Sequence, residues 1–273
     1  MTPIRYFPLI ATAAISLTLG GRAGVPPAIA QAMAAAQEAR IGAASHIQPL
    51  RSGFNFPRQT LRYEAEYRFW IAGVATLRVE RSGSQEHVLG TADSTGVVAV
   101  LFKVQDRFES YFDASSLCSQ KLTKNTEEGS HSRDTQIAFD YNRGKAVLDE
   151  VNLKTNEKKR QENDIPSCVT DVLSGILYVA SLPLQQGATY IFPLNDGGKT
   201  VTVQAHVEGK EQLKTPAGTF ETVRVGPEGD SGVLKNRGRI WIWYTDDARH
   251  LPVQMRAKLF WGTLTVYLTA IDK

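Results

Sequence analysis

The chain has few of the residues that build metal and redox sites. It contains two cysteines and five histidines in 273 residues, and no histidine pair shows the H-x-H or H-E-x-x-H spacing of a metal site. The sequence also lacks a G-x-S-x-G motif, a P-loop and a dinucleotide-binding fingerprint. We therefore expect a protein that is not an enzyme and that holds no metal and no cofactor.

Long apolar runs are confined to the N-terminal end of the chain. Arg5 precedes a mostly apolar stretch over residues 6–19, and Ala28-Ile29-Ala30 offers the small-residue pattern of a cleavage site. We predict a signal peptide over residues 1–30, with an uncleaved membrane anchor as the alternative. Export of this kind leads to the periplasm or the outer-envelope periphery of a Gram-negative-type bacterium.

Neither sign of charge is in excess. The predicted signal peptide carries Arg5 and Arg22 and no acids, so the rest of the chain has 31 − 2 = 29 basic and 28 acidic residues, a net charge of +1. A near-neutral chain offers no electrostatic basis for binding nucleic acid. We expect a monomer whose partner is a lipid, another apolar ligand or an envelope protein.

The two cysteines, Cys118 and Cys168, are 50 residues apart, which is too wide for a redox C-x-x-C motif. In an oxidising compartment such a pair tends to form a disulfide. We predict a structural disulfide between them, with two separate free thiols as the alternative.

The spacing of apolar residues predicts a mainly β protein over residues 59–273. From Leu61 to Phe69, apolar and aromatic residues alternate with charged ones, which is typical of a half-buried strand. Comparable segments, joined mostly by short polar turns, predict further strands at 75–80, 86–95, 97–112, 117–126, 133–140, 145–153, 188–193, 199–208, 211–215, 219–227, 238–245, 253–259 and 264–270. We expect an antiparallel meander that forms a curved sheet or an incomplete barrel.

Three other segments differ from this pattern. Residues 31–58 are Ala-rich and then irregular, which indicates an arm or linker, and the charged run 154–164 indicates a solvated loop or an exposed hairpin end. Residues 169–181 place their apolar side chains on one helical face. This amphipathic helix would pack on the sheet and separate two similar β subunits.

Local signals mark both ends of the predicted helix. Ser167 or Thr170 could cap its start, Asp171 falls in the first turn, and Pro183 stops it. The predicted disulfide would tie the start of this helix to the hairpin at Cys118.

The C-terminal segment from Arg237 to Lys258 contains an aromatic strand, a polar turn and a second strand. A shorter copy, Asp113-Ala114-Ser115-Ser116-Leu117-Cys118, parallels Asp247-Ala248-Arg249-His250-Leu251-Pro252. The copy favours hairpin architecture over an active site built on the paired aspartates, which suit a solvated turn.

One serine lies in a motif of hydrolytic enzymes. Gly229-Asp230-Ser231-Gly232 matches the nucleophile motif of chymotrypsin-like proteases, but His46, the faint histidine candidate, precedes the first clear strand. A Gly-rich loop explains the tetrapeptide better. A serine hydrolase using Ser231 is therefore only a remote alternative.

The aromatic residues are the remaining sign of a binding site. A curved sheet with a helix across its concave face can leave an apolar cavity. The candidate ligand-binding residues are Trp70, Phe102, Tyr178, Trp241 and Trp243. Ordinary core packing is the alternative for the same side chains.

Several motifs, in the same order, resemble the DUF3108 family of exported bacterial proteins, over roughly residues 59–272. They are the L-x-Y-x-x-x-Y…G-x-A-x-L-x-V pattern of Leu61–Glu80, the segments Phe102–Tyr111, Asp171–Ser174 and Thr215–Phe220, and the C-terminal hairpin. The family has no assigned function, so the resemblance implies no site residues. The strand-rich plan and the hairpin ending in Leu251-Pro252 are also similar, more loosely, to lipoprotein-carrier half-barrels, which implies lipid handling only by analogy.

These observations lead to one main functional expectation. We expect a non-enzymatic envelope protein that binds an apolar ligand, such as a lipid acyl chain, in a concave β-sheet covered by the helix. The alternative is an envelope assembly or structural factor that acts through protein contacts.

Overall fold

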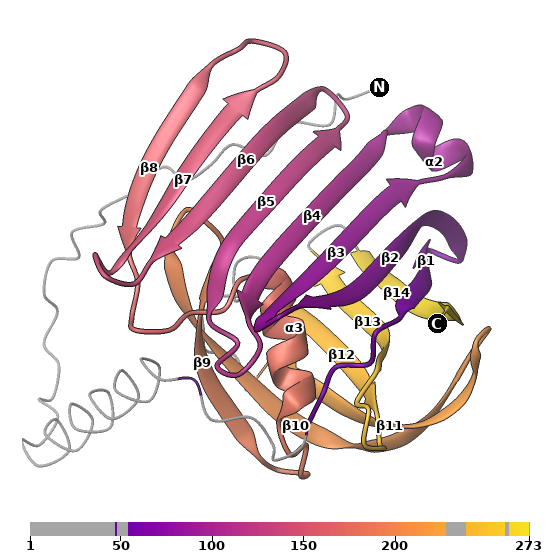
Figure 1. The fold of residues 1–273 in the computed structure, drawn as a ribbon. Helices are drawn as coiled ribbons and strands as arrows, with labels where there is room; N and C mark the ends of the chain where they lie inside the picture. Colours follow the sequence, from indigo (N-terminus) through magenta and orange to yellow (C-terminus); the bar gives the residue numbers. More distant parts are fainter. Residues whose placement is uncertain (1–46, 48–53, 228–238, 260–261, 273) are drawn as a thin grey trace, which may run out of the picture. The chain divides into compact units, whose positions relative to one another are not determined.

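The computed structural model describes residues 47, 54–227, 239–259 and 262–272 (Figure 1). The predicted signal peptide, most of the arm at 31–58 and the candidate Ser231 lie outside the described residues. The expectations for these segments stay predictions.

The described chain forms a mainly β fold, as predicted, with strands arranged in a single antiparallel meander sheet of 14 strands. Its strands are β1 (Thr60–Tyr67), β2 (Trp70–Ser82), β3 (Gln85–Ser94), β4 (Val104–Asp113), β5 (Ser119–Glu128), β6 (His131–Asp140), β7 (Lys145–Asn152), β8 (Lys158–Asp164), β9 (Thr189–Asn195), β10 (Thr200–Thr215), β11 (Gly218–Pro227), β12 (Arg239–Thr245), β13 (Pro252–Leu259) and β14 (Gly262–Asp272). Two short helices, α2 (Gly96–Leu101) and α3 (Val172–Ser181), complete it.

The sheet consists of two runs of neighbouring strands joined where the first strand meets the last. The spatial order runs from β8 back to β1, then from β14 back to β9. β1 pairs with β14 from Thr60↔Asp272 to Tyr67↔Leu264. β8 and β9 are the two edges of the described sheet, so the barrel is not closed. This confirms the expectation of a curved sheet or incomplete barrel.

Side chains bridge the gap between the two sheet edges. Gln161 on β8 donates from Nε2 to the carbonyl of Gly198 at 2.8 Å, and Asn163 donates from Nδ2 to the carbonyl of Gly197 at 3.1 Å. The turn between β9 and β10 therefore lies against β8 without joining its backbone ladder.

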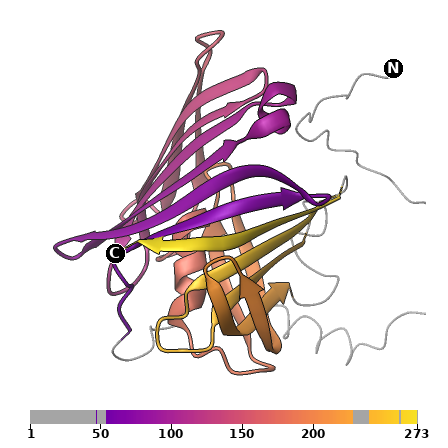
Figure 2. The same cartoon turned by 90° about the vertical axis from the view of Figure 1, so that its right-hand side faces the viewer.

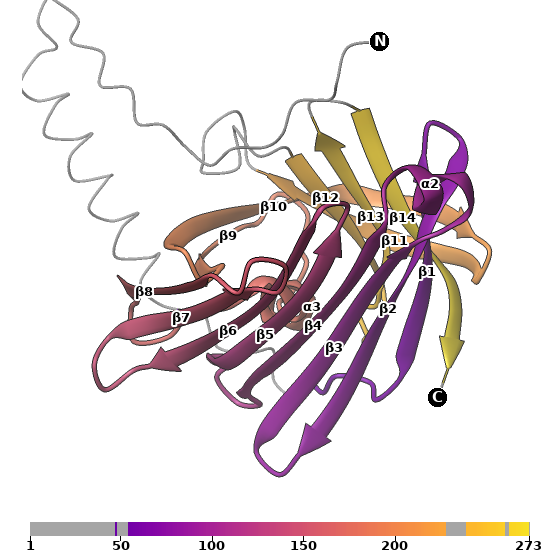
Figure 3. The same ribbon diagram turned by 90° about the horizontal axis from the view of Figure 1, so that it is seen from above.

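α3 lies inside the curve, between the β1–β8 and β9–β14 parts of the sheet (Figures 2 and 3). Its Leu173 contacts Gly90 on β3, and its Gly175 lies against Leu194 on β9. The helix belongs to a core to which both parts of the sheet contribute. No helix in the described ranges is long and apolar enough to cross a bilayer.

Two local expectations were wrong. Residues 97–101, expected within a strand, form α2, because β3–β4 pairing ends at Asp93↔Gln105 and leaves this segment without a partner strand. The strand expected to run from Leu61 to Phe69 ends at Tyr67, because Arg68 and Phe69 form the turn and adopt φ angles of 49° and 70°. Ala72 falls at a β-bulge opposite Ala65 and Glu66, which accounts for the extra residue.

The segment 154–164, expected as a solvated loop or exposed hairpin end, provides both the β7–β8 turn and the exposed edge strand β8. Its charged side chains suit an edge, because charge discourages pairing with another sheet.

Candidate functional site

The main candidate site is a cavity of about 420 Å³ between α3 and the inner faces of β9–β13. Most of its lining side chains are apolar. They include Val172, Ile176 and Val179 from α3, Phe192 and Leu194 from β9, Val201 and Val203 from β10, Ile240, Ile242 and Tyr244 from β12, and Met255 from β13. Ligand sites commonly have volumes of roughly 300–1,000 Å³ and apolar walls, so both size and chemistry suit a small apolar ligand.

Strand alternation decides which residues of β12 reach the cavity. Ile240, Ile242 and Tyr244 line it, whereas Trp241 and Trp243 point to the opposite face of the sheet. The Tyr244 hydroxyl donates to the carbonyl of Ile176 in α3 at 3.0 Å. Burial raises the pKa of Tyr244, so this phenol stays neutral and hydrogen-bonded in the cavity wall.

The two tryptophans of β12 contact charged side chains on the other face of the sheet from the cavity, where Trp243 is buried and Trp241 is half-buried. Trp241 donates from Nε1 to Glu208 at 2.9 Å, and Trp243 donates from Nε1 to Glu211 at 2.8 Å. The guanidinium of Arg256 lies 5.2 Å from the centre of the Trp243 ring. These contacts bury much of the tryptophan surface on the side of the sheet away from the cavity.

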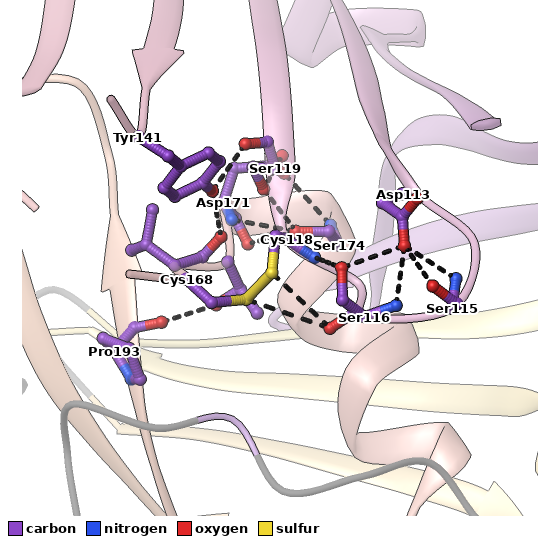
Figure 4. The surroundings of a disulfide bond; sticks show 12 residues. Asp113, Ser115, Ser116, Cys118, Ser119, Tyr141, Cys168, Asp171, Ser174 and Pro193 are labelled. Atoms are coloured by element: carbon purple, nitrogen blue, oxygen red, sulfur yellow. Dashed lines mark hydrogen bonds between the residues drawn. A yellow bond between two sulfur atoms is a disulfide. The ribbon is translucent and has the colours of Figure 1, made fainter. Parts of the chain in front are cut away.

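A buried carboxylate positions α3 at one side of the cavity. Asp171 is the N-cap of the helix and accepts hydrogen bonds from the amides of Leu173 at 2.8 Å and Ser174 at 3.0 Å. Its other oxygen accepts from Ser119 at 2.7 Å (Figure 4) and from Ser110 at 2.5 Å. The expected caps Ser167 and Thr170 are therefore wrong, because Asp171 reaches the free amides of the first turn and completes a capping box with Ser174.

The predicted disulfide is confirmed and lies just before this helix. Cys118 and Cys168 are bonded, with their Cα atoms 5.0 Å apart (Figure 4). Beside the bond, the amide of Ser119 donates to the carbonyl of Val169 at 2.9 Å. The Tyr141 hydroxyl donates to the carbonyl of Ser119 at 2.7 Å. The start of α3 is thus tied to the β4–β5 hairpin by covalent and hydrogen bonds.

A cationic side chain lies beside the turn that borders the cavity. The Lys124 ammonium donates to the carbonyl of Asp196 at 2.9 Å, and Asp196 itself lines the cavity. Burial lowers the pKa of Lys124, while the nearby carboxylates of Asp196 and Glu150 oppose that shift. A ligand with a polar end would meet Asp196 at this turn.

A second hollow, of about 370 Å³, lies against β3–β6 and is mainly polar. Gln105, Asp106 and Arg107 of β4 contribute to it. Burial, and after it the nearby carboxylate of Glu128, raises the pKa of Asp106 to about 6. Within the described ranges no group of three or more His, Cys, Asp or Glu residues could hold a metal ion.

The structure separates the five aromatic residues proposed for ligand binding. Tyr178 is fully buried and packs edge-to-face on Phe192, with ring centroids 4.8 Å apart. Trp70 and Phe102 are 75% and 53% exposed. Since Trp241 and Trp243 occupy the outer face, none of the five lines the apolar cavity, and their binding of a ligand stays a prediction.

The sequence analysis missed the cavity residues Ile240 and Ile242, which alternate along β12 with the tryptophans that it selected. The alternation of β12 shows that Ile240 and Ile242 share one face and Trp241 and Trp243 the other. Both faces are apolar enough to be internal. Only the carboxylates of Glu208 and Glu211, which are distant in sequence, identify the tryptophan face as the outer one.

The two repeated Asp-Ala segments are turns, as their likeness suggested. Asp113 accepts from the amides of Ser115 and Ser116, and Asp247 accepts from the amide of Arg249. Their carboxylates therefore stabilise hairpin ends.

Comparison with solved structures finds proteins that share little sequence with this chain. A β-barrel-like protein of domain of unknown function DUF1849 from Brucella abortus has a TM-score of 0.52 at 8% identity, covering 81% of this chain and 99% of that one. An inferred exported protein with a YmcC-like fold from Bacteroides fragilis has a TM-score of 0.32 at 9% identity, with 81% and 99% covered. An inferred lipoprotein from Parabacteroides distasonis has a TM-score of 0.31 at 12% identity, with 80% and 98% covered.

Sequence comparison identifies the family. No curated protein matches this chain. Residues 62–269 match the family described as protein of unknown function (DUF3108), and that match spans most of the 273 residues. The chain therefore belongs to the DUF3108 family.

Proposed function

We propose that this protein is a non-enzymatic envelope protein that binds the acyl chain of a lipid or a similar apolar ligand beneath α3. The observation that carries the proposal is the cavity of about 420 Å³ with apolar walls from one helix and several strands. Burial of each methylene group contributes about 0.8 kcal/mol, so an extended chain of several methylenes has a strong driving force to enter.

The arrangement around the cavity supports an amphipathic ligand. The Tyr244 hydroxyl donates its hydrogen bond to the carbonyl of Ile176, so this part of the wall needs no hydrogen bond from the ligand. Asp196 lies in the β9–β10 turn at the cavity, and Lys124 of β5 donates to its carbonyl, so the polar end of a lipid would be received at this turn. The disulfide is consistent with an oxidising compartment, and we place the protein in the periplasm or at the outer-envelope periphery.

Two neighbouring residues of β12 provide a test with an internal control. Delipidated protein is titrated with a fluorescent fatty acyl probe. Ile242→Trp fills the cavity and should weaken uptake by at least about tenfold, which corresponds to 1.4 kcal/mol. Trp241→Phe changes the opposite face and should leave uptake near the wild-type level.

Ile240→Asp gives an independent test, because this lining residue is 47% exposed and tolerates a charge more readily than a buried site. It should also weaken uptake. Failure of the wild type to take up the probe, or equal losses in Ile242→Trp and Trp241→Phe, would contradict the proposal.

A further inference from the structure

One end of the sheet carries a group of large apolar side chains that face solvent. They come from the tip of the β1–β2 hairpin and from α2, and we call them the rim patch. The rim patch comprises Phe69, Trp70, Ile71, Val97, Val100, Leu101 and Phe102. Phe69 is 95% exposed and Val100 is 86% exposed. Contiguous apolar surface of this kind marks an interaction site.

The two parts of the rim patch are held together by backbone contacts. The amide of Thr95 donates to the carbonyl of Ala72 at 3.0 Å, and Gly73 pairs with Ser94. Phe102 packs over Gly129, where an added Cβ would lie 2.7 Å from the ring. The hairpin tip and α2 therefore present one surface.

α2 has the composition of a buried helix in an exposed position. Its sequence, Gly-Val-Val-Ala-Val-Leu, has no polar face, yet within the described structure none of its six residues is buried. A helix that is apolar all round normally lies in a protein core or in a membrane. No described segment of this chain covers α2, so within the described structure this helix lacks the apolar surroundings that its composition favours.

The hairpin tip is a two-residue turn that carries unusually bulky side chains. Arg68 and Phe69 both adopt left-handed φ angles, which bulky side chains rarely accept and which the β1–β2 pairing imposes. Strained turns of this kind concentrate at functional sites. Here the turn keeps the Phe69 side chain in solvent.

The charges in these two segments have a single sign. Residues 67–74 and 95–104 contain Arg68 and Lys103 and no acidic residue, and Lys103 forms an exposed ion pair with Glu127 of β5 at 3.0 Å. Basic residues beside exposed aromatic and aliphatic side chains match a bilayer interface, where anionic headgroups lie above the acyl region and tryptophan prefers the boundary. A protein interface of similar size would carry several hydrogen-bonding groups, whereas Trp70 supplies the only polar side-chain atom of the rim patch.

The rim patch shares one end of the sheet with the apolar cavity. In the strand register, Tyr67 at the hairpin tip pairs with Leu264, Leu264 with Ala257, and Ala257 with Ile240. Ile240 lines the cavity and is about half exposed. Three strand spacings, about 14 Å, therefore separate the hairpin from this end of the cavity.

From these observations we infer that the rim patch is a membrane-docking surface whose occupant is the interface of a bilayer that contains anionic lipids. Phe69 and Trp70 at the hairpin tip enter the interface beside Val100 and Leu101 of α2. Arg68 lies at headgroup level, beside the exposed ion pair of Lys103 and Glu127. Docking in this way brings the Ile240 end of the cavity to the membrane surface.

The inference is tested by flotation of the full chain with phosphatidylcholine vesicles that contain phosphatidylglycerol. The triple variant Phe69→Ser/Val100→Ser/Leu101→Ser should bind at least about tenfold more weakly, because large apolar side chains supply the driving force. Its fold should be unaffected, since all three side chains are exposed. The matched control is Leu153→Ser, an apolar residue 54% exposed after β7, which should float like the wild type.

Fluorescence quenching provides a second readout, which tests whether the rim patch itself, and not another apolar segment, contacts the membrane. Brominated lipids in the vesicles should quench part of the tryptophan emission, and Trp70→Phe should remove most of that quenching. Equal quenching in wild type and Trp70→Phe, or equal flotation of wild type and triple variant, would overturn the inference. A dimer that the triple variant dissociates, without vesicle binding, would assign the patch to a second copy and also overturn it.

Membrane docking and acyl-chain binding can be tested separately. Ile242→Trp changes the cavity and leaves the rim patch intact, so it should lose probe uptake and still float with vesicles. Loss of flotation in Ile242→Trp, with its unfolding midpoint preserved, would contradict the inference.

Discussion

At the scale of single residues, Asp171 links the helix to the sheet through one buried carboxylate. It accepts hydrogen bonds from two helix amides and from the hydroxyls of Ser110 and Ser119. No water can replace these bonds easily, because the residue is fully buried. The position of α3, and with it one wall of the cavity, depends on this side chain.

Asp171→Ala should lower the free energy of unfolding by about 3 kcal/mol, because it removes an N-cap and leaves buried donors without an acceptor. Urea unfolding followed by circular dichroism measures the change. The control is Asp149→Ala, which removes an exposed ion pair with Arg160 and should cost at most about 1 kcal/mol. Equal costs for the two variants would show that the buried network does not stabilise the helix.

Asp106 should make stability depend on pH. Its pKa is raised to about 6 in the folded state by burial and by Glu128, against about 3.9 in an unfolded chain. Between these values the folded state binds the proton more tightly, so stability falls as pH rises from about 4 to 6 and the loss is complete above that window. The Asp106→Asn variant cannot ionise at this position. The difference in free energy of unfolding, variant minus wild type, should therefore be about 1–2 kcal/mol larger at neutral pH than at about pH 4. Urea midpoints at both pH values measure it, and a pH-independent difference would refute the assignment.

At the scale of elements, the β9–β10 turn bridges the open side of the sheet. Gly197 has a φ of +97° and fits against the side chains of Ile137 and Leu148. A Cβ at this position would lie 2.4 Å from the Cδ1 of Ile137. Only glycine satisfies both the backbone conformation and the close approach.

Gly197→Ala should therefore destabilise the protein by several kcal/mol, combining left-handed strain with overpacking. Gly83→Ala is the matched control, because Gly83 also has a positive φ, of +62°, but nothing lies within 4 Å of its added Cβ. It should cost only about 1 kcal/mol. Thermal unfolding of the two variants compares them directly, and similar losses would mean that the turn does not pack on β6 and β7.

The sequence largely predicts which segments form strands and which form the main helix. It does not predict which strands pair with each other in the sheet. Alternation such as that of Leu61–Phe69 predicts a strand because its period of two is local, and the apolar face of 169–181 predicts a helix for the same reason. The β1–β14 pairing joins residues about 200 positions apart, such as Thr60 and Asp272, and no local pattern encodes it. The inward face of β12 was likewise undecided, since Glu208 and Glu211 are distant in sequence.

At the scale of the whole described domain, the fold combines a stable frame with two exposed apolar features. The disulfide, Asp171 and the β9–β10 turn hold α3 and both sheet edges in place. The cavity beside α3 and the rim patch lie at positions where this frame leaves apolar side chains uncovered. Both features suit a protein that meets lipid.

The most direct test of the acyl-chain cavity is photo-crosslinking with a fatty acid that carries a photoreactive group near its methyl end. After irradiation and proteolysis, mass spectrometry identifies the labelled peptides. The account predicts labels on α3, between Val172 and Val179, and on β12 at Ile240 or Ile242, with loss of these labels in Ile242→Trp. Labelling confined to the outer-face residues Trp241 and Trp243, or to the rim patch, would contradict it.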